Sequence, residues 1–362
     1  MNRALLPALA AGAVLLAGCS SAPERPDASG PDEQACVTGT LQYTWDSAED
    51  GDEDGGPVPT TAPVRAADWE LWAADDSGEP VVTGITDDQG SFDACVDGDL
   101  PAGASLHFPA SSRGLWQVVD DVGGSVHTFS VDVTGDDLGT VAVPRRDAGA
   151  WKIVDTAGEL YAERGTDSPC WTAREKTAAD CSTLSFVWAA DRKDGGYFDV
   201  GDSNSPILAG EDAASRHTIV HEAGHWWQWL LYDGRFPRVT DCTPHFIDKV
   251  TSRSCAWTEG FADAVAAYVL GDDVYVHDDG LVQSFASTRD LPVAAGDAVE
   301  GNVAASLLDL WQLADGWDDD LAVMTGEPSG DFEEYVTEDR PAAGLPVDAD
   351  VRRLLGGHTI DY

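Results

Sequence analysis

Basic residues are scarce in this 362-residue chain: 21 Lys and Arg stand against 65 Asp and Glu, which gives a formal net charge of −44. Nucleic acids and anionic membrane surfaces bind proteins through basic patches, so this deficit argues against both as partners. Apolar runs of about 18 residues, the length that a membrane span needs, are also missing. Hydrophobic residues still make up 43 % of the chain and include 13 Trp, so it can bury a core and is not globally disordered.

A shorter apolar run covers residues 4–17, after Arg3, and leads into the tetrad Leu16-Ala17-Gly18-Cys19. Its length suits the hydrophobic region of a signal peptide. The tetrad resembles a bacterial lipobox, in which cleavage precedes a Cys whose thiol is then acylated. We therefore expect a signal peptide at residues 1–18 and an exported, cell-surface lipoprotein whose only membrane anchor is the lipid on Cys19. An ordinary cleaved signal peptide is the alternative. Residues 19–35, rich in Pro, Ser and Asp, are expected to form a flexible tether.

Cysteine pairs with the CxxC spacing of metal sites are absent from the sequence. Export implies an oxidising compartment, and six cysteines remain once Cys19 is set aside. Six cysteines allow many pairings, but proximity along the chain favours two short loops. We predict structural disulfides rather than a thiolate zinc site. The predicted pairs are Cys170–Cys181, Cys242–Cys255 and, by elimination, Cys36–Cys95.

Residues 36–145 show a strand-like pattern without helical periodicity. Apolar and polar residues alternate between turns of Gly, Asp and Pro, which predicts an antiparallel β-sandwich. The opening VTGTLQY, the later WELWAADDSGEP and the turn TDDQGSF resemble the prealbumin-like or carboxypeptidase-regulatory-like modules of secreted proteins. This resemblance implies an accessory module rather than a catalytic one.

An acidic stretch at residues 46–56 lies between the first two predicted strands. Part of it imitates the start of a calcium-binding loop, but Thr61 occupies the position of the Glu that closes such loops. A flexible, solvated insertion is therefore favoured, and a bound Ca²⁺ is the weaker alternative. The residues that imitate the calcium loop are Asp50, Asp52, Asp54 and Gly55.

The pattern becomes mixed α and β over residues 150–340, and residues 341–362 are set apart as a C-terminal tail. Pro206 indicates that the short extended piece around it lies at a sheet edge, and Asp212 is a candidate N-cap for the helix that follows. The whole chain therefore predicts an α+β fold. Its second half is expected to hold strands at 183–188, 197–200 and 205–208 and helices at 212–232, 258–270 and 299–314.

His221-Glu222-Ala223-Gly224-His225 is an HExxH sequence in the first of these helices. Residues four apart lie one turn above each other on the same face, so both imidazoles can bind one Zn²⁺. Glu222 lies beside the first ligand, where its carboxylate can take a proton from a water molecule. The simpler alternative is a buried helix whose histidines are only packed and hydrogen-bonded.

A second motif, WTEGFAD, places Glu259 and Asp263 four positions apart on the next helix. Glu259 can complete a His₂Glu site that leaves one coordination position open. Asp263 can accept the free N–H of a ligand imidazole, that of His221, and fix its tautomer. Two carboxylates in an apolar stretch would be costly without a cation.

HEAGH followed by WTEGFAD resembles the gluzincin zinc metallopeptidases, the thermolysin-like branch with a downstream ExxxD. The resemblance implies a zincin-like domain with one Zn²⁺, bound by His221, His225 and Glu259. It implies Glu222 as the general base that deprotonates a zinc-activated water and Asp263 as the carboxylate behind a ligand. The metzincin alternative does not fit, because Gln228 and Leu231 occupy positions where its motif needs Gly and His or Asp.

Other parts of the site stay open at this level. The family's geometry implies that the strand before the site helix, with Ile207 and Leu208, pairs with the substrate backbone. His217 lies one turn before His221, but steps of four drift by about 40° on a helix, so we do not expect it to be a ligand. The loop 233–255 is expected to rim the cleft. No motif selects the oxyanion-stabilising residue among Tyr232, His245, Tyr268, Tyr275 and His277.

The leading hypothesis is a surface-anchored zinc endopeptidase that acts on proteins or peptides. One alternative is a non-catalytic zinc-containing lipoprotein that binds a ligand through its sandwich. Another is hydrolysis of a different amide, such as a mucin-type glycopeptide or a cell-wall stem peptide. The presence of Glu222 argues against a purely structural site, which needs four closed ligands and no base. Composition says nothing about the oligomeric state or the substrate sequence.

Overall fold

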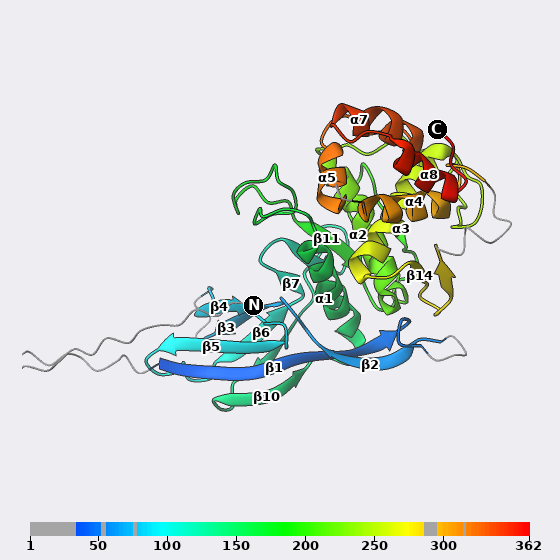
Figure 1. The fold of residues 1–362 in the computed structure, drawn as a ribbon. Helices are drawn as coiled ribbons and strands as arrows, with labels where there is room; N and C mark the ends of the chain where they lie inside the picture. The colour runs from blue at the N-terminus through cyan, green and yellow to red at the C-terminus, as the bar shows by residue number, and fades with distance from the viewer. Residues whose placement is uncertain (1–33, 52–55, 75–77, 286–294, 314–315) are drawn as a thin grey trace, which may run out of the picture.

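The computed structural model describes residues 34–51, 56–74, 78–285, 295–313 and 316–362. It confirms the predicted α+β fold: strands form one end of the molecule and helices the other (Figure 1). The predicted signal peptide and Cys19 lie outside the described residues, as do Asp52, Asp54 and Gly55 of the calcium-like stretch. Residues 34 and 35, which the sequence analysis places in the tether, already belong to the first strand.

Two sheets pack face to face in the N-terminal part, and buried side chains alternate with partly exposed ones along the central strands β3 (Asp68–Trp72) and β6 (Ser105–Pro109). In the first sheet, the long β1 (Gln34–Ser47) pairs antiparallel with β2 (Val58–Pro63) and β5 (Ser91–Asp97). Its pairing with β10 (Asp137–Ala142) is parallel, so the predicted sandwich is not antiparallel throughout. The second sheet has the order β4 (Val82–Ile85), β3 (Asp68–Trp72), β6 (Ser105–Pro109) and β9 (Thr128–Asp132).

A third sheet joins the two halves of the sequence. β8 (Trp116–Val119) pairs in parallel with β11 (Leu184–Trp188). β8 belongs to residues 36–145, which the sequence predicts to form the sandwich alone. The sheet order is β12 (Tyr197–Phe198), β13 (Pro206–Leu208), β11, β8 and β7 (Ser111–Ser112). The expectation that Pro206 marks a sheet edge is wrong, because β12 pairs with β13 and is itself the edge.

Three long helices carry and support the candidate site. α1 (Ala148–Ala162) packs between the sandwich and α2 (Arg216–Leu231), and α3 (Arg253–Leu270) packs against α2 and against α4 (Glu300–Trp311). α2 begins after residue 212 because residues 212–214 form a short 3₁₀ turn, η2, so Asp212 is not its N-cap. Ser215 caps α2 instead, and its hydroxyl accepts a hydrogen bond from the Thr218 N–H.

A carboxylate from the sandwich also meets the start of α2. Glu49 lies just after β1, and its Oε1 accepts hydrogen bonds from the backbone N–H groups of Arg216 and His217. Negative charge at a helix N-terminus is favourable because the first N–H groups have no partner within the helix. Lys152 of α1, almost fully buried, lies 3.7 Å from the other Glu49 oxygen. The N-terminal half therefore holds the helix that carries HExxH.

The C-terminal residues 341–362 pack onto the helical part, although the sequence sets them apart as a tail. Val351, Leu355 and Ile360 are buried in the common hydrophobic core. The remaining elements are η1 (Arg145–Asp147), the hairpin β14 (Val274–Val276) and β15 (Val282–Ser284), α5 (Gly316–Val323), α6 (Phe332–Glu334), the π-helical turn η4 (Tyr335–Asp339), α7 (Arg340–Ala342) and α8 (Ala349–Gly357).

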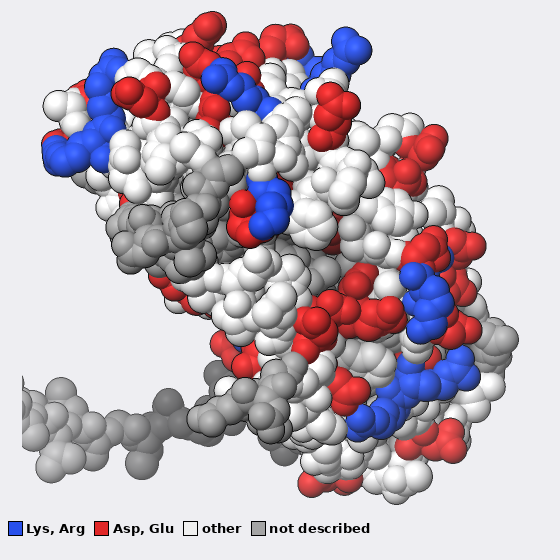
Figure 2. All heavy atoms as spheres, turned by 90° about the vertical axis from the view of Figure 1, so that its right-hand side faces the viewer, with Lys and Arg blue, Asp and Glu red and all other residues white. Residues whose placement is uncertain are grey.

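The six cysteines of the described part form the three pairs that the sequence favours: Cys36–Cys95, Cys170–Cys181 and Cys242–Cys255. Among the described residues, no helix has both the length and the apolar character to span a membrane. Acidic side chains are spread over the face in Figure 2, and the basic ones form short runs between them.

Candidate metal centre

α2 places the two histidines of the HExxH sequence on one buried face. His221 and His225 lie one turn apart, and their Nε2 atoms approach to 3.1 Å. Both rings are almost fully buried, as is Glu222 between them in sequence. The neighbouring residues Trp226, Trp227 and Leu230 are buried as well, so most of α2 lies inside the protein. α2 is therefore a rigid core element, which suits a site whose side chains must hold a fixed geometry.

α3 brings Glu259 to the histidines because glycines let the helices approach closely. A Cβ on Gly224 would lie 3.2 Å from the Cα of Ala262, at the contact between α2 and α3. A Cβ on Gly260 would lie only 2.7 Å from the backbone oxygen of Glu300, at the contact between α3 and α4. As a result, Glu259 Oε2 lies 3.2 Å from His221 Nε2 and 3.1 Å from His225 Nε2.

These three atoms form a nearly equilateral triangle. Zinc–nitrogen and zinc–oxygen bonds of about 2.0–2.1 Å in a tetrahedral site put neighbouring ligand atoms about 3.3 Å apart. The observed edges of 3.1, 3.1 and 3.2 Å match that separation. Of the groups with three close ligand atoms in the described part of the chain, this one alone contains imidazoles and no disulfide. The donor set therefore fits one zinc ion.

Asp263 lies where the sequence places it, behind His221. Its Oδ1 is 2.8 Å from His221 Nδ1. A hydrogen bond from Nδ1–H to this carboxylate leaves the lone pair of Nε2 directed toward the triangle. His217, one turn earlier, is buried but points elsewhere, with its Nε2 3.2 Å from Asp272 Oδ1. The structure therefore separates His217 from the candidate ligands.

Glu222 is buried and has an unsatisfied oxygen. Its Oε2 has no hydrogen-bond partner within the described residues. Burial raises the pKa of the Glu222 carboxyl above its ordinary value. A carboxylate with a raised pKa and a free oxygen, next to both histidines, suits a group that accepts and returns a proton.

A cavity of about 350 Å³ opens onto the triangle. His221, Glu222, His225 and Glu259 form part of its wall, and the edge strand β12 forms another part. The rings of Phe198 and Phe236 lie 5.7 Å apart on that side. The loop 233–255 contributes the opposite rim, as the sequence predicts, through Val239, Cys242, Thr243 and His245.

His245 is the one member of the five oxyanion candidates that lines this cavity. Its Nδ1 lies 3.0 Å from Glu300 Oε2, and its Nε2 lies 3.9 Å from Glu259 Oε2. The hydrogen bond to Glu300 raises the pKa of His245 to about 9, against the opposing effect of burial. Glu300 itself, in the first turn of α4, is a residue that sequence reasoning missed; a carboxylate at the start of an apolar helix was its only signal.

The other four candidates have partners elsewhere. Tyr232 Oη lies 2.9 Å from Ser329 Oγ, and the Tyr268 ring stacks on Trp317 with centroids 4.2 Å apart. Tyr275 lies beside His221 but donates its hydroxyl to Thr218. His277 Nε2 contacts Gln283 Oε1 on the β14–β15 hairpin. None of the four lines the cavity at the triangle.

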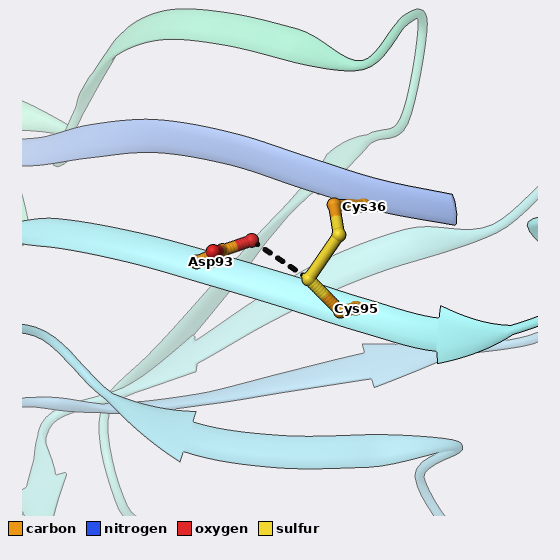
Figure 3. A group of neighbouring side chains, drawn as sticks. All are labelled: Cys36, Asp93 and Cys95. Carbon is orange, nitrogen blue, oxygen red and sulfur yellow. Dashed lines mark hydrogen bonds between the residues drawn. A yellow bond between two sulfur atoms is a disulfide. The ribbon is translucent and has the colours of Figure 1, made fainter. Parts of the chain in front are cut away.

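A second group of close ligand-type atoms lies on the sandwich. Asp93 Oδ1 is 2.9 Å from Cys95 Sγ, and Cys95 is bonded to Cys36 across β5 and β1 (Figure 3). A disulfide sulfur carries neither a negative charge nor a proton, so it is a poor metal ligand. This group does not form a second metal site.

Comparisons with solved structures give only weak likenesses. A 9R-lipoxygenase from Cyanothece PCC8801 is 16 % identical with a TM-score of 0.19, covering 40 % of this chain and 25 % of its own. The plantain major pollen allergen Pla l 1 is 17 % identical with a TM-score of 0.20, covering 30 % of this chain and 92 % of its own. This chain thus spans about a quarter of the lipoxygenase. Neither likeness bears on the architecture or the site, and no curated protein matches the chain.

Two family models cover almost all of the described chain. The model described as the mycolysin middle domain matches residues 36–150, which hold the sandwich, β7, β8 and the start of α1. The model described as the mycolysin C-terminal domain matches residues 164–359, which hold α2, α3, α4 and the candidate site. Because the second match alone spans more than half of the sequence, this protein belongs to the mycolysin family, a family of peptidases.

Proposed function

We propose that this protein is an exported zinc-dependent endopeptidase that hydrolyses peptide bonds in proteins or peptides. The single observation that carries the proposal is the triangle of His221 Nε2, His225 Nε2 and Glu259 Oε2 at the edge of a cavity. Membership of a peptidase family supports the same activity. Three protein ligands leave a coordination position open, which is typical of catalytic rather than structural zinc.

His221, His225 and Glu259 would hold the zinc ion. When bound, zinc supplies Lewis acidity, which favours the deprotonation of water and polarises a carbonyl group. Glu222, which forms part of the cavity wall, accepts the proton of the attacking water and returns it to the departing amine. Asp263 keeps His221 in the tautomer that leaves Nε2 unprotonated.

His245 is the best-placed donor for the oxyanion that develops on the substrate carbonyl. Its Nδ1–H donates to Glu300, which leaves Nε2–H directed into the cavity. A fixed donor aimed at developing charge stabilises the transition state more than the ground state. Glu300 acts through His245, by orienting the ring and keeping it protonated, and is therefore a positioning residue.

Strand β12 offers an edge for substrate backbone. The family resemblance implies this role for Ile207 and Leu208, but β12 covers one side of their strand and β11 the other. Tyr197 and Phe198 of β12 line the cavity and form the open edge of the sheet. We assign backbone pairing with an extended peptide to β12, since sheet edges bind peptides by strand addition.

The three disulfides fit an exported protein. Anchoring to the membrane through a lipid on Cys19 remains part of the proposal and rests on the lipobox-like tetrad. Mass spectrometry of the membrane fraction tests it: a diacylated or triacylated N-terminal peptide that begins at Cys19 is expected. A secreted protein without acyl groups contradicts the anchor and leaves the peptidase proposal untouched.

The Glu222→Gln variant tests the activity. Gln has the shape of Glu but cannot accept the proton, so hydrolysis of unfolded casein is expected to be lost while about one zinc per chain stays bound. Metal analysis and casein hydrolysis are measured on the same sample. Asp132→Asn, at an exposed position of β9 on the sandwich and outside the cavity wall, is the control and keeps full activity.

Two results would overturn the proposal. One is a purified wild-type protein that carries no zinc and gains no activity when zinc is supplied. The other is a Glu222→Gln variant that cleaves casein as fast as the wild type. The non-catalytic alternative predicts zinc in both proteins and cleavage by neither.

A further inference from the structure

The disulfide Cys242–Cys255 lies directly at the candidate metal centre. Cys255 is on α3, one turn before Glu259, so both side chains lie on the same face of that helix. Cys242 belongs to the facing loop, and its Sγ lies 3.6 Å from Glu259 Oε1. One ligand-type atom from each of Cys242, Cys255 and Glu259 falls within 4.8 Å of the others. A sulfur pair therefore touches the carboxylate that completes the triangle.

The two sulfurs of this bond differ in access. Cys242 lines the cavity, together with His221, His225 and Glu259. Cys255 is fully buried and does not line it. Of the two cysteines, only Cys242 therefore belongs to the wall of the cavity that opens onto the triangle.

The other two disulfides do not lie beside a candidate zinc ligand. Cys36–Cys95 has one carboxylate beside it, Asp93, and lies on the sandwich (Figure 3). Cys170 and Cys181 belong to none of the groups of close ligand atoms in the described part of the chain. Among the three bonds, Cys242–Cys255 alone combines a sulfur in the cavity wall with a candidate zinc ligand at contact distance.

We propose that Cys242 is a latent fourth zinc ligand, which the bond to Cys255 keeps out of the coordination sphere. The inference rests on the zinc site of the proposed function. Reduction of the bond frees the Cys242 sulfur, which then closes the open position and stops hydrolysis. Four protein ligands with one Cys form the closed set that is typical of structural zinc sites. Oxidation restores the open, active site.

The chemistry balances with a dithiol as the reductant. The dithiol supplies two electrons and two protons; the bond between Cys242 and Cys255 breaks, two S–H groups form, and the reductant closes its own disulfide. When the Cys242 sulfur binds zinc, its proton passes to solvent, and the ligand that occupied the open position leaves. A sulfur anion is a soft donor that zinc binds well, so the closed state is favourable.

Single Cys variants separate the two sulfurs without a reductant. In Cys255→Ser, Cys242 is free; in Cys242→Ser, Cys255 is free; and Cys242→Ser/Cys255→Ser has neither thiol. Each protein is purified with Co²⁺ in place of Zn²⁺, because a thiolate bound to cobalt gives a sulfur-to-cobalt charge-transfer absorption. Casein hydrolysis by the zinc forms is measured alongside.

We expect the charge-transfer band and loss of hydrolysis in Cys255→Ser alone. Cys242→Ser and the double variant are expected to lack the band and to hydrolyse casein faster than Cys255→Ser, because all three lack the cross-link and only Cys255→Ser has a free Cys242 sulfur. If Cys255→Ser is poorly folded, the wild type is treated with increasing dithiol, and differential alkylation identifies which bond has opened. The band then grows with opening of Cys242–Cys255 and not with opening of Cys36–Cys95.

The proposal is overturned if Cys255→Ser or the reduced wild type binds one cobalt per chain with no charge-transfer band. It is also overturned if the double variant loses hydrolysis to the same extent as Cys255→Ser. Failure of the proposed function has a different signature: the oxidised wild type would then bind no metal, or would bind it and cleave no casein.

Discussion

Single side chains set the chemistry of the candidate site, and His245 offers the sharpest test among them. Replacement by Gln removes the charge of the imidazolium and its Nε2–H, so kcat is expected to fall by about 10²-fold or more, with little change in KM. The reason is that the hydrogen bond strengthens only as negative charge develops on the carbonyl oxygen. Steady-state kinetics on a peptide substrate measure the split.

Glu300→Gln is the companion variant. It keeps a hydrogen bond to His245 Nδ1 but removes the charge that raises the pKa of His245 to about 9. As the pH rises, His245 is therefore expected to lose its proton at a lower pH in the variant than in the wild type. The alkaline limb of the activity profile shifts to lower pH accordingly. A kcat of His245→Gln equal to that of the wild type, at equal zinc content, would contradict the assignment.

Asp212 is expected to weaken the folded state at neutral pH. Burial raises its pKa from 3.8 to about 6, although its Oδ2 accepts a hydrogen bond from the Ala209 N–H. Because the folded pKa lies above the unfolded one, protonation favours the folded protein, and this contribution to stability grows as the pH falls through 6. Asp212→Asn is always neutral and should be more stable than the wild type at pH 7.5, by about 1–3 kcal/mol.

Urea unfolding at several pH values between about 4.5 and 7.5 measures this difference. The advantage of Asp212→Asn is expected to shrink as the pH falls, whereas the exposed Asp191→Asn control should show no such trend. A constant difference across the range would refute the explanation by burial.

The residues of the site differed in how far the sequence could predict them. His221, Glu222, His225, Glu259 and Asp263 follow from fixed spacings on two helices, and the structure brings all five together. His245 and Glu300 could not be selected, because they are 55 residues apart and meet only through the packing of a loop against α4. Contacts of that kind leave no local pattern.

At the scale of helices, the spacing between α2, α3 and α4 controls the triangle. A methyl group at position 260 would meet the backbone oxygen of Glu300 at 2.7 Å and the Cβ of Val303 at 2.8 Å. Gly260→Ala is therefore expected to destabilise the protein by about 1–3 kcal/mol through overpacking. It should also lower zinc affinity, because the shift of α3 moves the neighbouring Glu259.

Chemical unfolding and a competitive zinc titration measure the two effects. Gly356→Ala is the matched control: it lies in α8, and a Cβ there meets no atom within 4 Å. That change should be neutral or stabilising by about 0.5–1 kcal/mol. Equal zinc affinity in Gly260→Ala and the wild type would show that helix spacing does not position Glu259.

The sequence predicted which helices and strands are present more reliably than the residues at which they begin and end. The three central helices are present, but α2 starts at Arg216 and α3 at Arg253, since the caps Ser215 and Ser252 set those boundaries through side-chain hydrogen bonds. The strand expected at 197–200 is shorter in the structure: β12 covers Tyr197–Phe198 and pairs with β13. A two-residue strand carries too little pattern to reveal its neighbour.

For the whole molecule, the shared sheet and core predict a single unfolding transition. β8 pairs with β11 across the sequence boundary, and one continuous hydrophobic cluster joins the sandwich to the helices. Arg65 after β2 is also paired with Asp155 of α1 at 2.6 Å. Parts that share so much buried surface cannot unfold separately without exposing it.

Calorimetry and near-ultraviolet circular dichroism check this expectation. Tryptophans in both halves, such as Trp69 and Trp257, are buried and report on local packing. Both methods should give the same midpoint, and the calorimetric and van't Hoff enthalpies should agree. Two resolved transitions would mean that the sandwich and the helical part are independent.

The sequence predicted two regions with different patterns, but it could not show that they share a sheet. β8 was read with the sandwich because it follows sandwich strands along the chain. Its partner β11 lies on the other side of α1, and parallel pairing over such a distance depends on tertiary packing.

The pairing of β8 with β11, which joins the two halves of the sequence, has a consequence for protein engineering. A gene cut near residue 150 would separate β8 from β11 and remove an interior strand from the sheet that β11 belongs to. A chimera that joins the C-terminal half to a different N-terminal domain would therefore need that domain to supply a strand equivalent to β8. Because the two halves share one sheet, we expect that neither can be replaced by an unrelated domain without loss of stability in the other.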